Sequence, residues 1–173
     1  MRRLAFSALF AALVGAPLLP AQGVRISMHA WPEPVLLDTM RQEHKLSAQP
    51  DRVYEAVQKA FGELGIPGGG TDSRAGIIAS ERFERTHNLA GAPMSRSFDC
   101  GIGATGPYAD SFRLEIAVVA WVKPGANGGT TLGLATIASG SDITGVFRKP
   151  KECASTGALE TRLLDRVSKI LAP

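Results

Sequence analysis

The sequence has few of the residues that a densely cross-linked, metal-bound or membrane-embedded protein needs. Among 173 residues there are two cysteines, three histidines, two tryptophans and two tyrosines. Two cysteines exclude a disulfide-dense scaffold, and beyond the N-terminal segment no apolar run approaches the roughly 18 residues of a membrane-spanning helix. The chain is 45% hydrophobic and 20% charged, which is typical of one globular domain.

Catalytic and cofactor motifs are also missing. His29, His44 and His87 show no metal-ligand spacing, and neither a G-x-S-x-G elbow nor a phosphate-binding loop occurs. A free Cys100 thiol beside His44 or His87 would form a nucleophile and base pair, which keeps a Cys/His-dependent enzyme as a third hypothesis. We expect a non-catalytic protein with no metal and no cofactor.

One stretch matches a nucleotide-binding pattern by its letters alone. The glycines at Gly101, Gly103 and Gly106 fit G-x-G-x-x-G. In dinucleotide-binding proteins this turn opens a helix whose N-terminus faces the pyrophosphate. Pro107 and a strand follow it here, so we expect a loop after Cys100 and no bound nucleotide.

The first 23 residues have the parts of a secretory signal peptide. Arg2 and Arg3 precede an uncharged apolar stretch over residues 4–15, which two prolines then end. The small residues Ala21 and Gly23 suit a signal peptidase, and we expect cleavage after Gly23 or, as a second choice, after Ala21. The alternative is an uncleaved N-terminal anchor.

Cleavage would change the charge balance of the protein. It leaves 17 Lys and Arg against 16 Asp and Glu, a net charge of +1 instead of +3. A nearly neutral chain is not expected to bind nucleic acid. Because no cysteine near the cleavage point offers a thiol for lipidation, we expect a periplasmic or secreted protein without a transmembrane segment.

Export also decides how the two cysteines are interpreted. In an oxidising compartment Cys100 and Cys153 most simply form one disulfide. The bond would close a loop of about 53 residues. The alternative is a reactive thiol or a metal thiolate, which needs a reduced cysteine and a partner that the spacing does not supply.

Two segments have the periodicity of amphipathic helices. Residues 50–64 place their apolar side chains on one face, with Pro50 suited to the first turn and Gly65 to the end. The C-terminal segment does the same, and Ser155 or Thr156 can cap its start. The apolar positions are Val53, Val57, Ala60, Phe61 and Leu64 in the first helix and Leu159, Leu163, Val167, Ile170 and Leu171 in the second.

The strongest strand pattern covers residues 112–122. One face is apolar throughout, and the other becomes apolar toward Trp121. A Gly-rich turn and a β-branched stretch at 130–138 follow, which predicts an antiparallel hairpin. Other expected elements are strands at 41–46 and 76–83, a surface excursion at 84–97 and a loop at 140–151.

Together these elements predict an α+β fold. An antiparallel sheet would carry two amphipathic helices packed on one face, in a two-layer, helix-grip-like arrangement. Residues 41–173 would form this single domain. Residues 24–40 would form an extended N-terminal arm with a short helix at 35–40.

The helices and their flanks carry a resemblance. Residues 47–57 read Ser-x-x-x-x-x-Val-Tyr-x-Ala-Val, Leu-Gly-Ile follows at 64–66, Gly-Ile-Ile at 76–78, and Cys-Ala-Ser-Thr-Gly-Ala-Leu-Glu at 153–160. This pattern resembles uncharacterised bacterial exported envelope proteins and, more distantly, helix-grip domains of the accessory lipoprotein of the outer-membrane β-barrel assembly machine. The similarity covers about residues 41–171. Its motifs are structural, so it transfers no catalytic residue, and this chain lacks the lipoprotein's lipidated cysteine.

The resulting hypothesis is a non-catalytic exported interaction or accessory domain of the cell envelope, with an envelope protein as one class of partner. The alternative is a carrier of an apolar small molecule or lipid between the sheet and the C-terminal helix. A basic cluster is either a contact for acidic headgroups or an acidic partner, or a solvated loop. The candidate cavity lining is Phe112, Leu114, Ile116, Leu163 and Val167, which are otherwise core residues, and the basic cluster is Arg148, Lys149 and Lys151.

Overall fold

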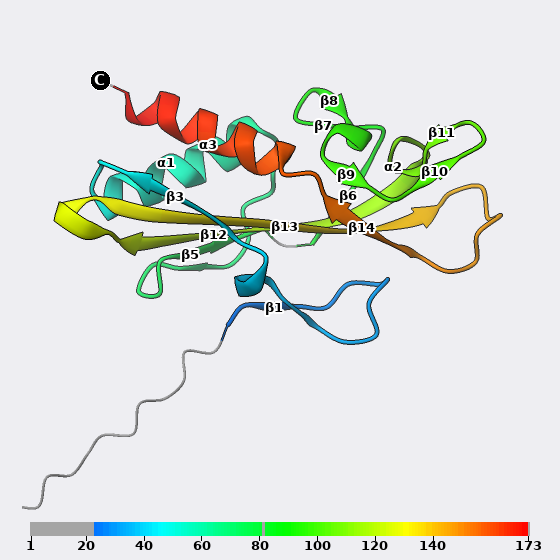
Figure 1. The fold of residues 1–173 in the computed structure, drawn as a ribbon, viewed down its shortest axis with the longest axis horizontal. Helices are drawn as coiled ribbons and strands as arrows, with labels where there is room; N and C mark the ends of the chain where they lie inside the picture. The colour runs from blue at the N-terminus through cyan, green and yellow to red at the C-terminus, as the bar shows by residue number, and fades with distance from the viewer. Residues whose placement is uncertain (1–22, 81, 173) are drawn as a thin grey trace, which may run out of the picture.

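The computed structural model describes residues 23–80 and 82–172, and its centre is one long antiparallel hairpin (Figure 1). Strands β12 (Phe112–Pro124) and β13 (Thr130–Asp142) pair along their whole length of 13 residues each. The predicted hairpin is confirmed, and both strands run further than expected. The predicted leader lies outside the described residues, except for Gly23.

Each long strand pairs with two short strands on its outer edge. Strands β6 and β5 lie along β12, with β4 beyond β5, and strands β3 and β14 lie along β13, with β9 beyond β14. Every pairing in this sheet is antiparallel, and the described residues give it eight strands, more than predicted. The short strands are β3 (Gln42–Leu46), β4 (Thr71–Asp72), β5 (Ile77–Ala79), β6 (Phe83–Thr86), β9 (Phe98–Asp99) and β14 (Lys151–Ser155).

A buried serine divides the strand that was predicted at 76–83. The Ser80 amide donates to the Val118 carbonyl at 2.8 Å, while the Val118 amide donates to Ser80 Oγ, also at 2.8 Å. The Ser80 hydroxyl thus accepts the hydrogen bond that a backbone carbonyl would accept in a regular ladder. The pairing of β5 with β12 ends there, and the chain pairs with β12 again as β6. The predicted surface excursion at 84–97 is therefore wrong at its start, which pairs with β12.

Both predicted helices are present and cover the same face of the sheet (Figure 1). They are α1 (Pro50–Glu63) and α3 (Ala158–Leu171). Their buried side chains pack on alternate residues of β12, as the two periodicities require. The residue before α3 is Gly157 rather than Ser155 or Thr156, although Thr156 Oγ1 accepts a hydrogen bond from the Ala158 amide at 3.3 Å.

The N-terminal arm covers the opposite face, so the fold has three layers where two were predicted. Strands β1 (Arg25–Ile26) and β2 (Val35–Leu36) form a small hairpin, and the expected short helix is a 3-10 turn at Leu37–Thr39. The arm is needed because this face of the hairpin is also apolar and would otherwise stay in water. The arm contributes Met28 and Leu37, which pack with Ala117, Val119, Trp121, Ala135 and Ile137.

Short elements fill the rest of the helix-bearing face. Within 84–97, Leu89 and Met94 are buried, so this segment contributes to the core instead of lying on the surface. The G-x-G-x-x-G stretch forms a tight hairpin, and the helix after it has only four residues. The elements are β7 (Asn88–Leu89), β8 (Ala92–Pro93), a 3-10 turn at Met94–Arg96, β10 (Ile102–Gly103), β11 (Gly106–Pro107), α2 (Tyr108–Ser111) and a 3-10 turn at Ala126–Gly128.

The predicted disulfide between Cys100 and Cys153 is formed. It joins the segment after β9 to the middle of β14, and Gly140 of β13 lies directly against it. A Cβ at Gly140 would come within 3.2 Å of Cys153 Sγ and 3.0 Å of the Phe112 ring. The absence of a side chain at Gly140 therefore lets the sulfur pair and the Phe112 ring pack closely against β13.

Removing the disulfide is expected to destabilise the fold. The bond spans 53 residues of sequence, and the chain-entropy relation gives about 4 kcal/mol for such a loop. We expect the Cys100→Ser/Cys153→Ser variant to lose about 2–4 kcal/mol of unfolding free energy in denaturant titrations. Reductant should destabilise the wild type and leave the variant unchanged; equal stability of the two oxidised proteins would contradict this assignment.

Two glycines with the same backbone conformation provide a matched test of the sheet. Gly65 and Gly76 have φ of +68° and +64°, but a Cβ at Gly76 would lie 2.1 Å from the Val122 carbonyl oxygen, whereas one at Gly65 meets nothing within 4 Å. Gly65→Ala should cost only the left-handed conformation, about 1–2 kcal/mol. Gly76→Ala should cost clearly more, measured as unfolding free energy, and similar losses would show that the close approach does not matter.

Candidate functional site

Exposed apolar side chains gather at one end of the long hairpin. Among the described residues five large hydrophobic side chains are exposed, and four of them lie in two neighbouring loops. Ile143, Val146 and Phe147 lie between β13 and β14, and Ile102 lies in the β10–β11 hairpin; both loops are at the right-hand end of Figure 1. Such a concentration marks an interaction surface more often than single scattered residues do.

Asp142, the last residue of β13, holds the first of these loops in shape. Its Oδ1 accepts hydrogen bonds from the Thr144 amide at 2.8 Å and the Thr144 hydroxyl at 2.7 Å, and its Oδ2 accepts one from the Phe147 amide at 2.9 Å. These bonds, first of all the one from the Phe147 amide, lower the pKa of Asp142 below its ordinary value of 3.8. These bonds therefore hold the loop in a conformation that leaves Ile143 and Val146 exposed.

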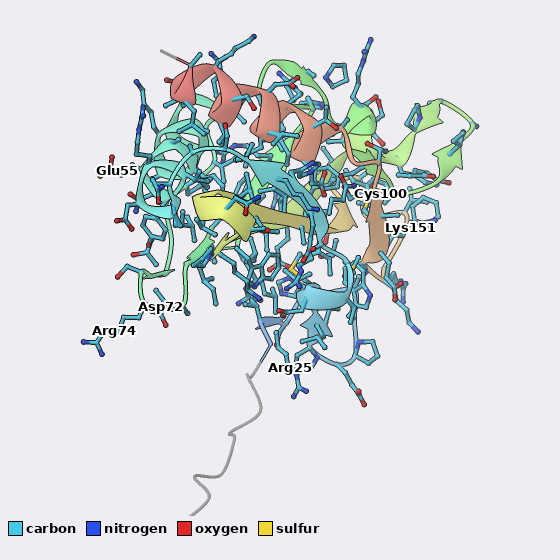
Figure 2. The ribbon with its side chains drawn as sticks, turned by 60° about the vertical axis from the view of Figure 1, so that its left-hand side comes forward. Arg25, Glu55, Asp72, Arg74, Cys100 and Lys151 are labelled. Carbon is cyan, nitrogen blue, oxygen red and sulfur yellow. A yellow bond between two sulfur atoms is a disulfide. The ribbon has the colours of Figure 1, made fainter. Side chains whose placement is uncertain are left out.

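An aromatic cluster joins the two loops. The Tyr108 ring lies 5.0 Å from the Phe112 ring and 5.3 Å from the Phe147 ring, between centroids. Lys151 places its Nζ 4.4 Å from the Tyr108 centroid and 5.0 Å from that of Phe147, within reach of cation–π attraction. Figure 2 shows Lys151 on the same side as Cys100 and far from Arg74.

The predicted basic cluster belongs to this surface. Arg148 and Lys149 are exposed in the loop, whereas Lys151 is half-buried and begins β14 instead of ending a loop as predicted. The loop itself is shorter than expected, because β13 continues to Asp142. We call the whole surface the apolar–basic end, and it consists of Ile102, Ile143, Val146, Phe147, Arg148, Lys149 and Lys151.

The sequence analysis found the charges of this end and missed its apolar residues. The available signal was the presence of Ile143, Val146 and Phe147 in a segment otherwise made of Gly, Ser, Thr and Asp. A loop of that composition has no periodic core face, so large apolar side chains within it are candidates for a surface.

A second polar cluster surrounds Glu115, whose side chain is only 11% exposed. Its Oε2 lies 3.0 Å from His29 Nδ1 and accepts a hydrogen bond from Ser139 Oγ at 3.2 Å, while Arg82 forms an ion pair with Oε1 at 3.4 Å. In the catalytic triad of a serine hydrolase, a histidine lies between the serine hydroxyl and the carboxylate. Here the carboxylate lies between them, so the cluster fastens the N-terminal arm to β12.

The other candidate catalytic residues lie elsewhere. Cys100 is bonded to Cys153, so its sulfur is not a free nucleophile in this state. His87 Nδ1 lies 2.9 Å from the Asp110 carbonyl oxygen, and His44 Nε2 is buried without a hydrogen-bond partner. Across residues 23–80 and 82–172, no group of three or more His, Cys, Asp or Glu side chains could hold a metal ion.

The candidate cavity lining is part of the packed core. Phe112, Leu114 and Ile116 of β12 and Leu163 and Val167 of α3 are all at most 3% exposed and belong to one hydrophobic cluster. The five pockets found on the described surface are lined by other residues.

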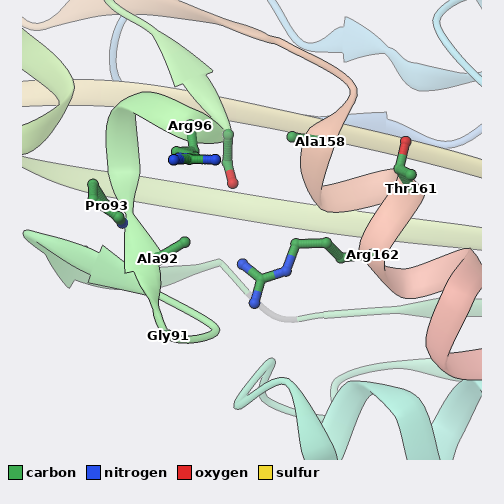
Figure 3. Close-up of a pocket in the computed structure, with 8 residues that line it drawn as sticks. Gly91, Ala92, Pro93, Arg96, Ala158, Thr161 and Arg162 are labelled. Atoms are coloured by element: carbon green, nitrogen blue, oxygen red, sulfur yellow. The ribbon is translucent and has the colours of Figure 1, made fainter.

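One open pocket of about 630 Å³ lies between the β7–β8 hairpin and the start of α3. Figure 3 shows the Arg162 side chain extending from α3 toward this hairpin, where it donates a hydrogen bond to the Ala90 carbonyl. Arg96 also lines the pocket. Another pocket, of about 590 Å³, lies beside the disulfide, with Trp31 and Met40 of the N-terminal region on its rim.

In the part of the chain that the structure describes, no helix has the length and apolar character to cross a bilayer. No protein-family model matches the sequence, and no curated protein matches it significantly.

The hydrogen bonds of Asp142 predict an acid-dependent loop. Because the pKa is lowered in the folded state, the stabilising contribution of the Asp142 carboxylate is fully present above pH 3.8 and is lost as the pH falls through the lowered value. In NMR titrations the Thr144 and Phe147 amides should shift in one step below pH 3.8, and Asp142→Asn should remove that step. A step centred at or above the ordinary value would refute the prediction.

Proposed function

We propose that this chain is a non-catalytic, exported accessory domain of the cell envelope that binds through its apolar–basic end. The observation that carries the proposal is the position of the exposed large hydrophobic side chains: of the five in residues 23–80 and 82–172, four lie at this end. Such side chains in water favour association, because burial against a partner removes them from solvent.

Export is supported by two independent features. The N-terminal 23 residues have the charge and hydropathy pattern of a signal peptide. The disulfide between Cys100 and Cys153 is the form that two cysteines take in an oxidising compartment. The resemblance to exported envelope proteins points to the same location.

A binding role is favoured over the two alternatives. A carrier would need a cavity where Phe112, Ile116 and Leu163 lie, and these side chains pack against one another in the core. A Cys/His-dependent enzyme would need a free thiol, and Cys100 is in a disulfide. The apolar–basic end requires no rearrangement before it can contact a partner.

The proposal predicts that envelope association depends on the exposed apolar residues of the loop. The full chain, expressed in a bacterium with a C-terminal epitope, should be processed after Gly23 or Ala21 and recovered with the envelope fraction. Ile143→Ser/Val146→Ser should release most of it, because the exposed side chains no longer gain from burial. Fractionation and N-terminal sequencing measure both results.

Met40→Ser is the matched control, since Met40 is an exposed large hydrophobic residue outside this end and is 47% exposed. Both altered residues of the double variant are exposed, so folding should be unaffected. Equal envelope recovery of the double variant and the wild type would reject the proposed binding surface, and recovery of the unprocessed chain in the cytosol would reject export.

A further inference from the structure

We infer that the partner of the apolar–basic end is a bilayer surface rich in anionic lipid, an inference that rests on the proposed function and names its target. The end combines two kinds of side chain that a bilayer interface takes up together. Apolar groups enter the boundary between headgroups and acyl chains, and cationic groups pair with the lipid phosphates.

The shape of this end suits a bilayer. Its most exposed apolar residues are Ile102 at 78%, in the β10–β11 hairpin, and Val146 at 75%, in the loop between β13 and β14. Figure 1 shows both loops projecting from the same end of the sheet. A stable protein interface usually buries a broad continuous patch of about 800 Å² on each partner. Apolar residues on two separate loops make little continuous area, but each loop can enter a fluid interface on its own.

The distribution of charge favours an anionic surface. Arg148 and Lys149 follow the apolar residues directly and are exposed. Of the acidic residues in the same segment, Asp142 directs its oxygens to the loop's own donors, and Glu152 lies beyond Lys151 on β14. Because the mature chain is nearly neutral, the attraction has to come from this local cluster rather than from overall charge.

The half-buried residues suit the same environment. Lys151 places its ammonium group over the Tyr108 and Phe147 rings, so a positive charge is held beside the apolar residues of this end. Tyrosine has an apolar ring and a polar hydroxyl, a combination enriched at the headgroup level of bilayers. Asp142 keeps the loop ordered before contact, so binding need not order it first.

Vesicle flotation with the purified, disulfide-bonded mature chain tests this inference. Wild type should float with vesicles of phosphatidylcholine and phosphatidylglycerol, bind pure phosphatidylcholine at least several-fold more weakly, and dissociate as salt is raised. Each basic residue near an anionic surface contributes about fivefold in affinity. Arg148→Glu/Lys149→Glu should therefore lose well over tenfold in binding to the anionic vesicles.

Controls separate local from general effects. Arg74→Glu/Lys123→Glu makes the same change in net charge at exposed positions outside this end and should bind like wild type, as should Met40→Ser. Ile143→Ser/Val146→Ser should weaken binding even where the charges are kept. Denaturant titrations of every variant verify that folding is retained.

The outcomes distinguish the lipid target from the proposed function. If wild type does not bind anionic vesicles, or if the two charge-reversal variants bind equally, the lipid inference is wrong. If envelope recovery still depends on Ile143 and Val146 in that case, the binding surface stands and its partner is an envelope protein. If envelope recovery is also independent of these residues, both proposals are rejected.

Discussion

The structure depends on a hairpin that is apolar on both faces and longer than the helices that cover it. Strands β12 and β13 have 13 residues each, which span roughly 44 Å at the rise of an antiparallel strand. Helices α1 and α3 have 14 residues each but span only roughly 21 Å. Two helices lying side by side therefore cover about half of one face, and other segments must cover the remainder (Figure 1).

The irregular part of the chain follows from this difference in length. Beyond the helices, the segment from β7 to α2 places Leu89, Met94 and Phe98 on the uncovered half of the face. The disulfide and the pairing of β9 with β14 fasten this segment to the sheet. Gly140 leaves room for the sulfur pair against β13. The apolar–basic end lies beyond this covered part of the hairpin, in the loop after β13 and in the β10–β11 hairpin.

The sequence was sufficient to predict those elements in which a regular spacing of apolar side chains extends over many residues. The periods of α1, α3 and β12 were read correctly, including the second apolar face that ends at Trp121. The short elements could not be predicted, because a few contacts determine each of them. Ser80 divides a strand through its hydroxyl, and β14 pairs with β13 over only three residues. For the candidate site, Arg148 and Lys149 were visible as charges, but exposure of Ile143 and Val146 depends on how Asp142 folds the loop.

The hydrogen bonds of Asp142 explain why Ile143 and Val146 stay exposed. A flexible loop with three large apolar side chains would lower its free energy by collapsing onto the sheet. Asp142 opposes the collapse, because its carboxylate accepts hydrogen bonds from the Thr144 and Phe147 amides in the projecting conformation. Phe147 does turn inward, onto Tyr108 and Phe112, and this contact anchors the base of the loop while Val146 stays outside. Because the loop is already ordered, little conformational entropy would be lost when its apolar residues are buried against another surface. More of the free energy of that burial would then contribute to affinity.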